Sequence, residues 1–342
     1  MDRRTFFTLV SGGAFLTTSR LFAEHHVLSA DPLLTVFDLS SSPDRYTDIE
    51  DFYVRNHHAT PPDTGENLLR IEGEVEEPKQ LTVESLASLP QREIGAVLEC
   101  AGNTVGTTGQ VSNGLWRGWP LGEVLSLARP KRLGTHVHLL GRDGYVRSVP
   151  VERIHCDGLL VTHLNSLPLR RHHGAPWRAL LVGWYGMDSV KWLERIRVST
   201  SDLPVTGNEY TELTLDPSGQ VSRQPLPRVQ VKSVIASPTS GAVLRRGKTE
   251  LRALAWSGEG KISKLEASAD GGRTWHTAEL QRSTPHEWAL GGITLELDQS
   301  GAVELVCRAT DEKGFSQPIE RDGRRLDSYA NNWCHRVRCV VA

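Results

Sequence analysis

Residues 94–103 read Ile-Gly-Ala-Val-Leu-Glu-Cys-Ala-Gly-Asn. The apolar residues at alternate positions, Ile94, Ala96 and Leu98, predict a strand with one face in a hydrophobic core. Cys100 follows where this strand gives way to a glycine-containing loop. A rigid strand end can hold such a thiol as a ligand of a soft metal. The alternative, from this segment alone, is a buried and inert cysteine that packs like a small apolar residue.

Short strands and helices alternate on both sides of this segment, as far as residue 228. The predicted strands are residues 68–73, 94–99, 136–140, 159–162, 179–182 and 196–198. Thr82 is placed to cap a helix that Pro90 ends, and Pro120 opens a helix that runs to residue 128. We therefore expect a mixed α+β domain over residues 51–228. The polar, turn-rich residues 24–50 predict an irregular arm before it.

A change of pattern near residue 228 marks a second domain, residues 229–342. Short β runs recur there between Gly and Pro turns, at residues 231–235, 248–255, 264–268, 293–297, 303–310 and 335–341. This regular spacing predicts a β-sandwich of about seven strands.

Composition and charge exclude several classes of protein. The chain has 342 residues, 38% hydrophobic and 23% charged, which is typical of a folded protein with room for about two domains. The formal charge is -2 and no dense basic stripe is present, so we expect no nucleic-acid partner. Beyond residues 6–22, no window approaches the roughly 20 apolar residues of a membrane span, so we expect none in the mature chain.

The first 23 residues have the layout of an export signal. Arg3 and Arg4 precede the apolar segment 6–22, as in a twin-arginine signal. The alternative is an ordinary first helix with two surface arginines. Because the twin-arginine route exports folded proteins, this signal predicts a periplasmic protein whose cofactor is inserted before export.

The cysteines do not form a recognisable redox or haem motif. There are five, Cys100, Cys156, Cys307, Cys334 and Cys339, so at least one is unpaired in a monomer even in an oxidising compartment. No C-x-x-C-H motif for covalent haem and no C-x-x-C pair occurs. One thiol is therefore available for a task other than bridging.

Five segments together resemble the sulfite oxidase family of molybdopterin enzymes. In order, they are Phe-Tyr-Val-Arg-Asn-His at 52–57, Leu-Glu-Cys-Ala-Gly-Asn at 98–103, Trp-Arg-Gly at 116–118, His-Gly-Ala-Pro-Trp-Arg at 173–178 and Gly-Trp-Tyr-Gly-Met-Asp-Ser-Val-Lys-Trp at 183–192. Residues 268–278 and 332–337 resemble the family's C-terminal immunoglobulin-like dimerisation domain. The resemblance implies a sulfite-oxidase-like molybdopterin domain, an immunoglobulin-like sandwich and a homodimer.

The resemblance also implies a Mo-molybdopterin cofactor and its binding residues. Cys100 would be the protein thiolate on molybdenum, beside two sulfurs of the pterin dithiolene. The implied pterin contacts are Tyr53, Arg55, His57, Asp143, His173, Arg178, Ser189 and Lys191. Arg, Lys and His suit the terminal phosphate of a pyranopterin, because they make charge-assisted hydrogen bonds. The alternatives are solvated surface charges, or a zinc site, although no H-E-x-x-H or matched Cys/His pair is present.

One departure from the family bears on the substrate. Animal and plant relatives carry two arginines after Cys-Ala-Gly-Asn, whereas Thr104 and Val105 stand there in this chain. The loss of a guanidinium from a desolvated pocket removes a contact worth about 1.5–3 kcal/mol. Arg55 is the candidate cation to replace it, and Tyr210 is the candidate for the family's active-site tyrosine.

These observations predict an exported molybdenum oxidoreductase that oxidises sulfite to sulfate by oxygen-atom transfer. Arg55, Cys100 and Tyr210 would be its catalytic residues, and a c-type cytochrome its external electron acceptor. One alternative is a molybdenum-dependent reductase of a small S-oxide or N-oxide, which the missing arginine favours. Another is a non-catalytic periplasmic binding protein that keeps the fold without redox chemistry.

Overall fold

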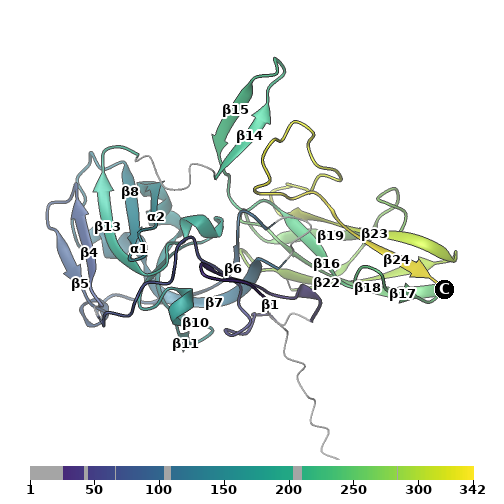
Figure 1. Cartoon of the computed structure of the whole chain (residues 1–342), viewed down its shortest axis with the longest axis horizontal. Helices are drawn as coiled ribbons and strands as arrows, with labels where there is room; N and C mark the ends of the chain where they lie inside the picture. Colours follow the sequence, from purple (N-terminus) through teal and green to yellow (C-terminus); the bar gives the residue numbers. More distant parts are fainter. Residues whose placement is uncertain (1–25, 42–44, 66, 104–108, 203–209, 283) are drawn as a thin grey trace, which may run out of the picture.

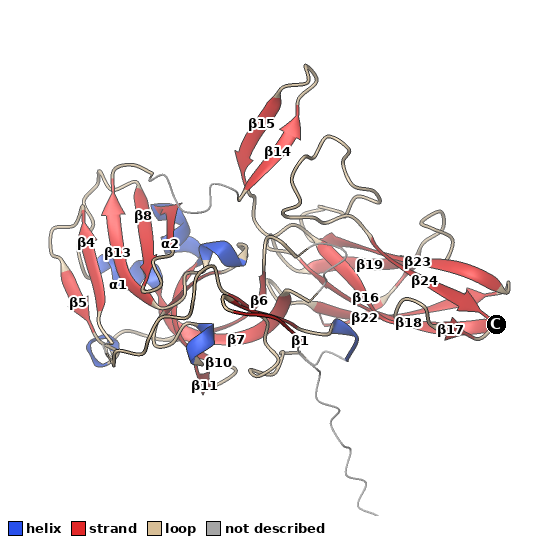
Figure 2. Ribbon diagram, viewed as in Figure 1, coloured by secondary structure: helices blue, strands red, loops and turns tan. Residues whose placement is uncertain are grey.

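The computed structural model describes residues 26–41, 45–65, 67–103, 109–202, 210–282 and 284–342. Two sheet-rich parts lie side by side, and a hairpin projects near their junction (Figures 1 and 2). Among the described residues, only two segments are α-helical, α1 (Leu121–Ser126) and α2 (Val151–Asp157). Neither is long or apolar enough to cross a bilayer. The predicted twin-arginine signal, residues 1–23, lies outside the described residues.

The first domain is built on two five-stranded sheets. One has the order β11-β10-β7-β6, with β12 also paired to β10, and the other has the order β5-β4-β13-β8-β9. The first sheet comprises β6 (Arg92–Glu99), β7 (Val111–Pro120), β10 (Gly158–Leu164), β11 (Leu167–Pro168) and β12 (Arg178–Leu181). The second comprises β4 (Leu69–Gly73), β5 (Lys79–Leu81), β8 (His136–Gly141), β9 (Val146–Pro150) and β13 (Leu193–Ser199).

The close approach of β7 and β10 explains why position 118, in the Trp-Arg-Gly segment, is a glycine. A Cβ added at Gly118 in β7 would lie 1.9 Å from the carbonyl oxygen of Leu160 in β10. Only glycine allows these two backbones to approach so closely. The sheet that carries β6, and with it Cys100, depends on this approach.

The first domain contains more sheet and less helix than we expected from the sequence. The predicted helix after Thr82 is wrong, because only one 3-10 turn, η2 (Glu84–Leu86), forms there. Thr82 N donates to Ser85 Oγ at 2.9 Å and Ser85 Oγ donates back to Thr82 O at 2.7 Å. Such local side-chain bonds compete with helical backbone bonds. The other 3-10 turns are η1 (Leu39–Ser41), η3 (Arg171–His173) and η4 (Gly186–Asp188).

The arm before the first domain is also more regular than we expected. It contains an antiparallel hairpin of β1 (His26–Ala30) and β2 (Leu33–Val36), and β2 pairs with β3 (Val54–Arg55). The prediction of an irregular arm is therefore wrong. Its strands are ordered by pairing with one another and with β3, which a reading of local composition does not detect.

The second domain is a sandwich of two sheets, in agreement with the expected immunoglobulin-like architecture. One sheet has the order β16-β18-β22-β21 and the other β17-β24-β23-β19-β20. The first comprises β16 (Lys232–Ser237), β18 (Gly247–Trp256), β21 (Glu279–Arg282) and β22 (Ala289–Leu297). The second comprises β17 (Val243–Leu244), β19 (Ile262–Ser268), β20 (His276–Thr277), β23 (Gly301–Asp311) and β24 (His335–Val341).

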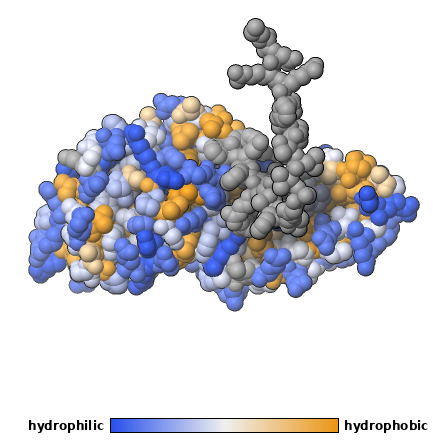
Figure 3. Space-filling model, turned by 90° about the horizontal axis from the view of Figure 1, so that it is seen from below, coloured by the Kyte–Doolittle hydropathy of each residue, from blue (hydrophilic) through white to orange (hydrophobic). Residues whose placement is uncertain are grey.

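A hydrophobic cluster joins the two domains. Val97 and Tyr185 of the first domain pack in one buried cluster with Trp256 and Trp288 of the second. The hairpin of β14 (Thr211–Leu215) and β15 (Val221–Pro225) projects above this junction (Figure 1). On the face seen in Figure 3, hydrophobic residues lie in separate patches among hydrophilic ones on both domains.

Candidate functional site

A cavity at the end of β6 brings together nine of the ten site residues that we expected from the sequence. These are Tyr53, Arg55, His57, Cys100, Asp143, Arg178, Ser189, Lys191 and Tyr210. They come from segments as far apart in the chain as residues 53 and 210. Their convergence on one cavity is a consequence of the tertiary fold.

Cys100 lies where β6 ends, and backbone hydrogen bonds hold it on both sides. Its amide donates to the carbonyl of Gln110 at 3.0 Å, and its carbonyl accepts from the amide of Asn103 at 2.9 Å. The thiol is free, as are the other four cysteines. Burial raises the pKa of the Cys100 thiol, while the positive charge of Arg55 acts in the opposite direction. A bound metal cation would favour the thiolate over the thiol.

Two cations in the cavity wall, the buried Arg178 and the half-buried Lys191, form no ion pair with an acidic group among the described residues. Arg178 is 3% exposed, its Nε has no hydrogen-bond partner there, and burial lowers its pKa to about 10. Burial also lowers the pKa of Lys191 well below its usual value. Lys191 Nζ donates only to neutral oxygens, Asn56 Oδ1 at 2.7 Å and the carbonyl of His172 at 2.8 Å. Buried charges are normally paired, so these two cations fit an anionic group such as a phosphate.

The remaining polar residues offer hydrogen-bonding groups of different kinds. Ser189 is 3% exposed, and its Oγ accepts from the amide of Leu181 at 3.1 Å. Asp143 Oδ1 accepts from the amide of Tyr145 at 3.1 Å, and burial raises the pKa of this carboxyl group. A carboxylate, a hydroxyl and two cations on one cavity suit a ring system with N–H groups at one end and a phosphate at the other.

Three aromatic rings, those of His57, Tyr145 and Tyr210, line part of the cavity as an aromatic wall. The His57 ring centroid is 5.2 Å from that of Tyr145 and 6.4 Å from that of Tyr210. Tyr210 in turn lies 5.2 Å from the ring of Tyr329, which belongs to the second domain. Tyr329 does not line the cavity, so the second domain packs behind Tyr210.

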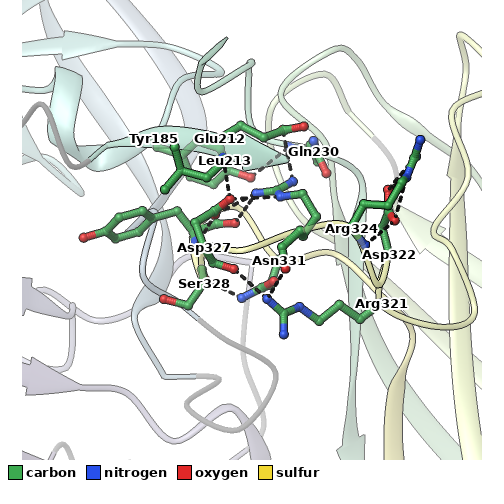
Figure 4. Close-up of polar contacts among 12 residues, drawn as sticks. Tyr185, Glu212, Leu213, Gln230, Arg321, Asp322, Arg324, Asp327, Ser328 and Asn331 are labelled. Atoms are coloured by element: carbon green, nitrogen blue, oxygen red, sulfur yellow. Dashed lines mark hydrogen bonds and ion pairs between the residues drawn. The ribbon is translucent and has the colours of Figure 1, made fainter. Parts of the chain in front are cut away.

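The loop that carries Tyr329 is anchored to the β14–β15 hairpin by an ion-pair network (Figure 4). Arg325 pairs with Glu212 at 3.0 Å and with Asp327 at 2.8 Å. The amide of Leu213 donates to Asp327 Oδ2 at 2.8 Å. These bonds tie the loop to the strand that directly follows Tyr210.

Three residues that the sequence argument used do not line the cavity among the described residues. One of them, His173, is described, and the other two are not. His173 lies behind the wall, where its Nε2 is 3.1 Å from the carbonyl oxygen of Ile49 and its carbonyl accepts from Arg178 Nη1 at 3.1 Å. Burial lowers the pKa of His173 well below its usual value. Thr104 and Val105 lie outside the described residues.

The sequence argument also missed several residues that line the cavity. Asn56, Tyr145, Met187 and Trp192 are all in its wall. Each lies within two residues of one that was expected, so proximity in the sequence was the available signal. Tyr145 Oη donates to the carbonyl of Met187 at 2.9 Å, a contact between segments 42 residues apart that no local pattern predicts.

Arg147 was missed for a different reason. It is buried, donates to Asp188 Oδ1 at 2.9 and 2.7 Å, and lies 5.8 Å from the centroid of the Tyr210 ring. Arg153 pairs with the second oxygen of Asp188 at 3.4 Å. Two arginines share one carboxylate, so this cluster carries a net positive charge beside Tyr210.

Comparison with known families agrees with this site. Residues 57–206 match the family described as an oxidoreductase molybdopterin binding domain. Residues 223–342 match the family described as a Mo-co oxidoreductase dimerisation domain. The first match contains six of the nine cavity residues named above. Tyr53 and Arg55 lie just before it, and Tyr210 lies just after it.

Individual relatives are similar over most of the chain. The sulfite oxidase of Gallus gallus is 31% identical over 306 residues, covering 78% of this chain and 67% of the relative. The mitochondrial sulfite oxidase of Rattus norvegicus is 28% identical, covering 85% of this chain, and the chain spans 60% of that relative's length. The NADH nitrate reductase of Ulva prolifera is 29% identical, and the chain spans 40% of it.

A solved structure extends the similarity to the whole fold. The sulfane dehydrogenase SoxCD from Paracoccus pantotrophus superposes with a TM-score of 0.84 at 26% sequence identity, covering 96% of this chain and 93% of that chain. The cation-lined cavity, the free thiol at the end of β6 and these matches agree. The chain belongs to the sulfite oxidase family of molybdopterin-dependent oxidoreductases, and its cofactor is Mo-molybdopterin.

Proposed function

We propose that this chain oxidises sulfite to sulfate and that Cys100 is the protein ligand of its molybdenum. The observation that carries the proposal is the position of the Cys100 thiol on the same cavity as two cations that form no ion pair among the described residues. A soft thiolate suits molybdenum, and the cations suit the phosphate of the pterin.

The cavity residues divide between cofactor and substrate. Arg178 and Lys191 would hold the phosphate, and Asp143 and Ser189 would hydrogen-bond the pterin ring system. Tyr53 and His57 would pack against the cofactor from the side of the aromatic wall. His173 would support Arg178 through its carbonyl, which accepts from Nη1 at 3.1 Å.

Substrate binding falls to the residues nearer the opening of the cavity. Arg55 is exposed at the end of β3, where it can attract an oxyanion. Tyr210 can donate a hydrogen bond to the anion or orient the water that is consumed. The net positive cluster of Arg147, Arg153 and Asp188 adds favourable potential behind Tyr210.

The overall reaction requires an electron acceptor. Sulfite and water yield sulfate, two protons and two electrons, so sulfur is oxidised and the electrons must leave the protein. When bound, the molybdenum supplies oxygen-atom transfer and takes up these electrons. The chain has no C-x-x-C-H motif, so a separate c-type cytochrome is the proposed acceptor. We place this reaction in the periplasm on the basis of the twin-arginine pattern, and the match to a dimerisation domain supports a homodimer.

A second candidate substrate is sulfane sulfur. This chain matches 93% of the length of the structure named as a sulfane dehydrogenase. It matches 67% and 60% of the length of the two relatives named as sulfite oxidases. Sulfane sulfur needs less cationic binding than sulfite, which fits the absence of the family's two arginines at Thr104 and Val105. The same absence of arginines fits a reductase of small S-oxides or N-oxides, because these substrates are uncharged. In that case electrons would flow to the substrate and not from it. A non-catalytic binding protein would retain the cavity without turnover.

Steady-state assays of the molybdenum-loaded protein separate these functions. Sulfite-dependent reduction of ferricyanide or a c-type cytochrome supports the proposal, whereas turnover only with a persulfide-bearing peptide supports sulfane oxidation. Oxidation of reduced viologen by dimethyl sulfoxide or trimethylamine N-oxide alone supports the reductase. Cys100→Ser should abolish the activity, and Cys156→Ser, which changes an exposed thiol on α2, should preserve it. Absence of turnover in every assay would contradict an enzymatic role.

A further inference from the structure

A buried ion pair joins the second domain to the residue that precedes Cys100. Glu99, at the end of β6, is 1% exposed, and Lys232, at the start of β16, is 2% exposed. Lys232 Nζ donates to Glu99 Oε1 at 2.8 Å and also to the carbonyl of Asn103 at 2.5 Å. One ammonium group therefore holds both ends of the loop that contains Cys100.

The other oxygen of Glu99 is held as well. Trp256 Nε1, from β18, donates to Glu99 Oε2 at 2.8 Å, and Asn103 Nδ2 donates to Oε1 at 2.9 Å. Trp256 is fully buried. Three donors from two domains thus fix the Glu99 carboxylate in position and direction.

Stability alone is a weak explanation for this arrangement. Removing two charges from water is costly, and buried ion pairs often contribute little compared with apolar residues of similar volume. What such a pair does provide is a fixed geometry, because each charged group requires its partner in place. Here the geometry that is fixed is that of a four-residue turn, in which Asn103 N donates to Cys100 O at 2.9 Å.

We propose that Glu99, Lys232 and Trp256 are positioning residues, through which the second domain sets the direction of the Cys100 thiolate toward molybdenum. The inference rests on Cys100 as the metal ligand of the proposed function, but it is independent of the substrate. The second domain then has a task at the metal site in addition to any role in dimerisation.

The test compares the double variant Glu99→Gln/Lys232→Met with a matched control. The double change removes both charges and keeps similar side-chain volumes, so no charge is left buried without a partner. Arg45→Gln/Glu287→Gln is the control, because this pair, 2.9 Å apart, ties the second domain to the arm through an exposed arginine and does not touch the Cys100 loop. Glu287 lies against the middle of β6, where a Cβ on Gly95 would be 2.3 Å from its Oε1. Trp256→Phe is a third variant that keeps the ion pair and loses one donor.

The readout is the thiolate-to-molybdenum absorption band of the oxidised protein, with molybdenum content measured on the same sample. Glu99→Gln/Lys232→Met should shift or broaden this band and lower kcat about ten-fold or more with KM little changed, as for other groups that orient metal ligands. The control should match the wild type, and Trp256→Phe should shift the band in the same direction by less.

Two results would overturn the inference. One is a double variant that retains molybdenum with the wild-type band and kcat. If the double variant fails to fold, an unchanged band in Trp256→Phe overturns it instead. A wild-type protein that holds molybdenum without any thiolate band would contradict the proposed function itself, so the two failures are distinguishable.

Discussion

The amide of Ala330, in the second domain, donates a 2.9 Å hydrogen bond to the carbonyl of Ala101, the residue after Cys100. This bond places the second domain directly against the loop at the end of β6. Tyr329, the residue before Ala330, packs behind the cavity with its ring centroid 5.2 Å from that of Tyr210. A Cβ added at Gly102 would lie 3.8 Å from Cys100 Sγ and 4.0 Å from Tyr329 Cε1. The second domain therefore supports the loop that carries the thiol, while the residues that line the cavity belong to the first domain.

The two tyrosines should differ in their effect on turnover. Tyr210 lines the cavity, whereas Tyr329 packs behind it. Tyr210→Phe should lower kcat for sulfite by about ten-fold or more, because a hydroxyl that donates to developing charge is lost. Tyr329→Phe should change kcat by less than about two-fold, since ring packing is kept. Steady-state kinetics check both, and equal effects of the two changes would contradict the assigned roles.

The strand that carries the thiol was accessible to sequence reasoning because its signal is local, whereas the role of Cys100 was inferred from the family resemblance. The alternation of Ile94, Ala96 and Leu98 correctly predicted β6, and the sandwich strands were predicted for the same reason. The cavity residues were predicted from the resemblance to the family's motifs. A motif identifies individual positions, whereas hydrophobic periodicity indicates only which face of an element is buried. Nine of the ten then met at one cavity.

The features that sequence reasoning missed depend on contacts between distant segments. The arm forms strands because β2 pairs with β3, and the β14–β15 hairpin is anchored by Arg325 from a loop about 100 residues later. Lys232 reads as an ordinary charge at the start of a strand, yet it is buried against Glu99. His173 does not line the cavity, because its ring lies against the distant segment at Ile49. None of these contacts leaves a local pattern.

Arg55 should act on substrate binding more than on chemistry. Because this residue is exposed, its attraction to an anion is partly screened by solvent. Arg55→Gln should raise KM for sulfite about five-fold, close to 1 kcal/mol, with kcat little changed. The effect should shrink as salt is added. Arg170→Gln, which breaks an exposed pair with Glu50, is the control. A fall in kcat at constant KM would contradict this assignment.

Lys191 should destabilise the protein that lacks the cofactor and should help the protein to retain the cofactor. Burial lowers its pKa, and its two hydrogen-bond acceptors are neutral. Lys191→Met should therefore raise the Tm of protein made without molybdopterin by roughly 2–4 °C, the effect of about 1 kcal/mol in a domain of ordinary size. The same change should lower the molybdenum content of protein made with the cofactor. Lys131→Met, at an exposed ion pair, should alter neither quantity. A cofactor-free variant with a lower Tm would contradict the argument.

His335 should make the second domain sensitive to acid. Burial lowers the pKa of His335 to about 4, and its Nδ1 accepts from the amide of Ile235 at 3.0 Å, so the folded state holds it neutral. The unfolded chain binds the proton near pH 6.5, so stability is lost as the pH falls from about 6.5 toward 4. The loss should approach about 3 kcal/mol.

Denaturant unfolding at pH 7 and pH 4.5 checks this prediction. His335→Gln should be less stable than the wild type at pH 7 and should lose less stability on acidification. His276→Gln, at an exposed position in β20, should leave the pH dependence unchanged. An unaltered pH dependence in His335→Gln would contradict the assignment to this residue.

The most direct test of the central claim is an anaerobic titration of sulfite into oxidised, molybdenum-loaded protein, followed by absorption and EPR spectroscopy. We predict that the thiolate-to-molybdenum band bleaches as sulfite is added, that a Mo(V) signal appears on partial reoxidation, and that Cys100→Ser lacks the band from the start. A band that resists excess sulfite but bleaches with dithionite would show a competent metal site that does not oxidise sulfite, and it would contradict the proposed function.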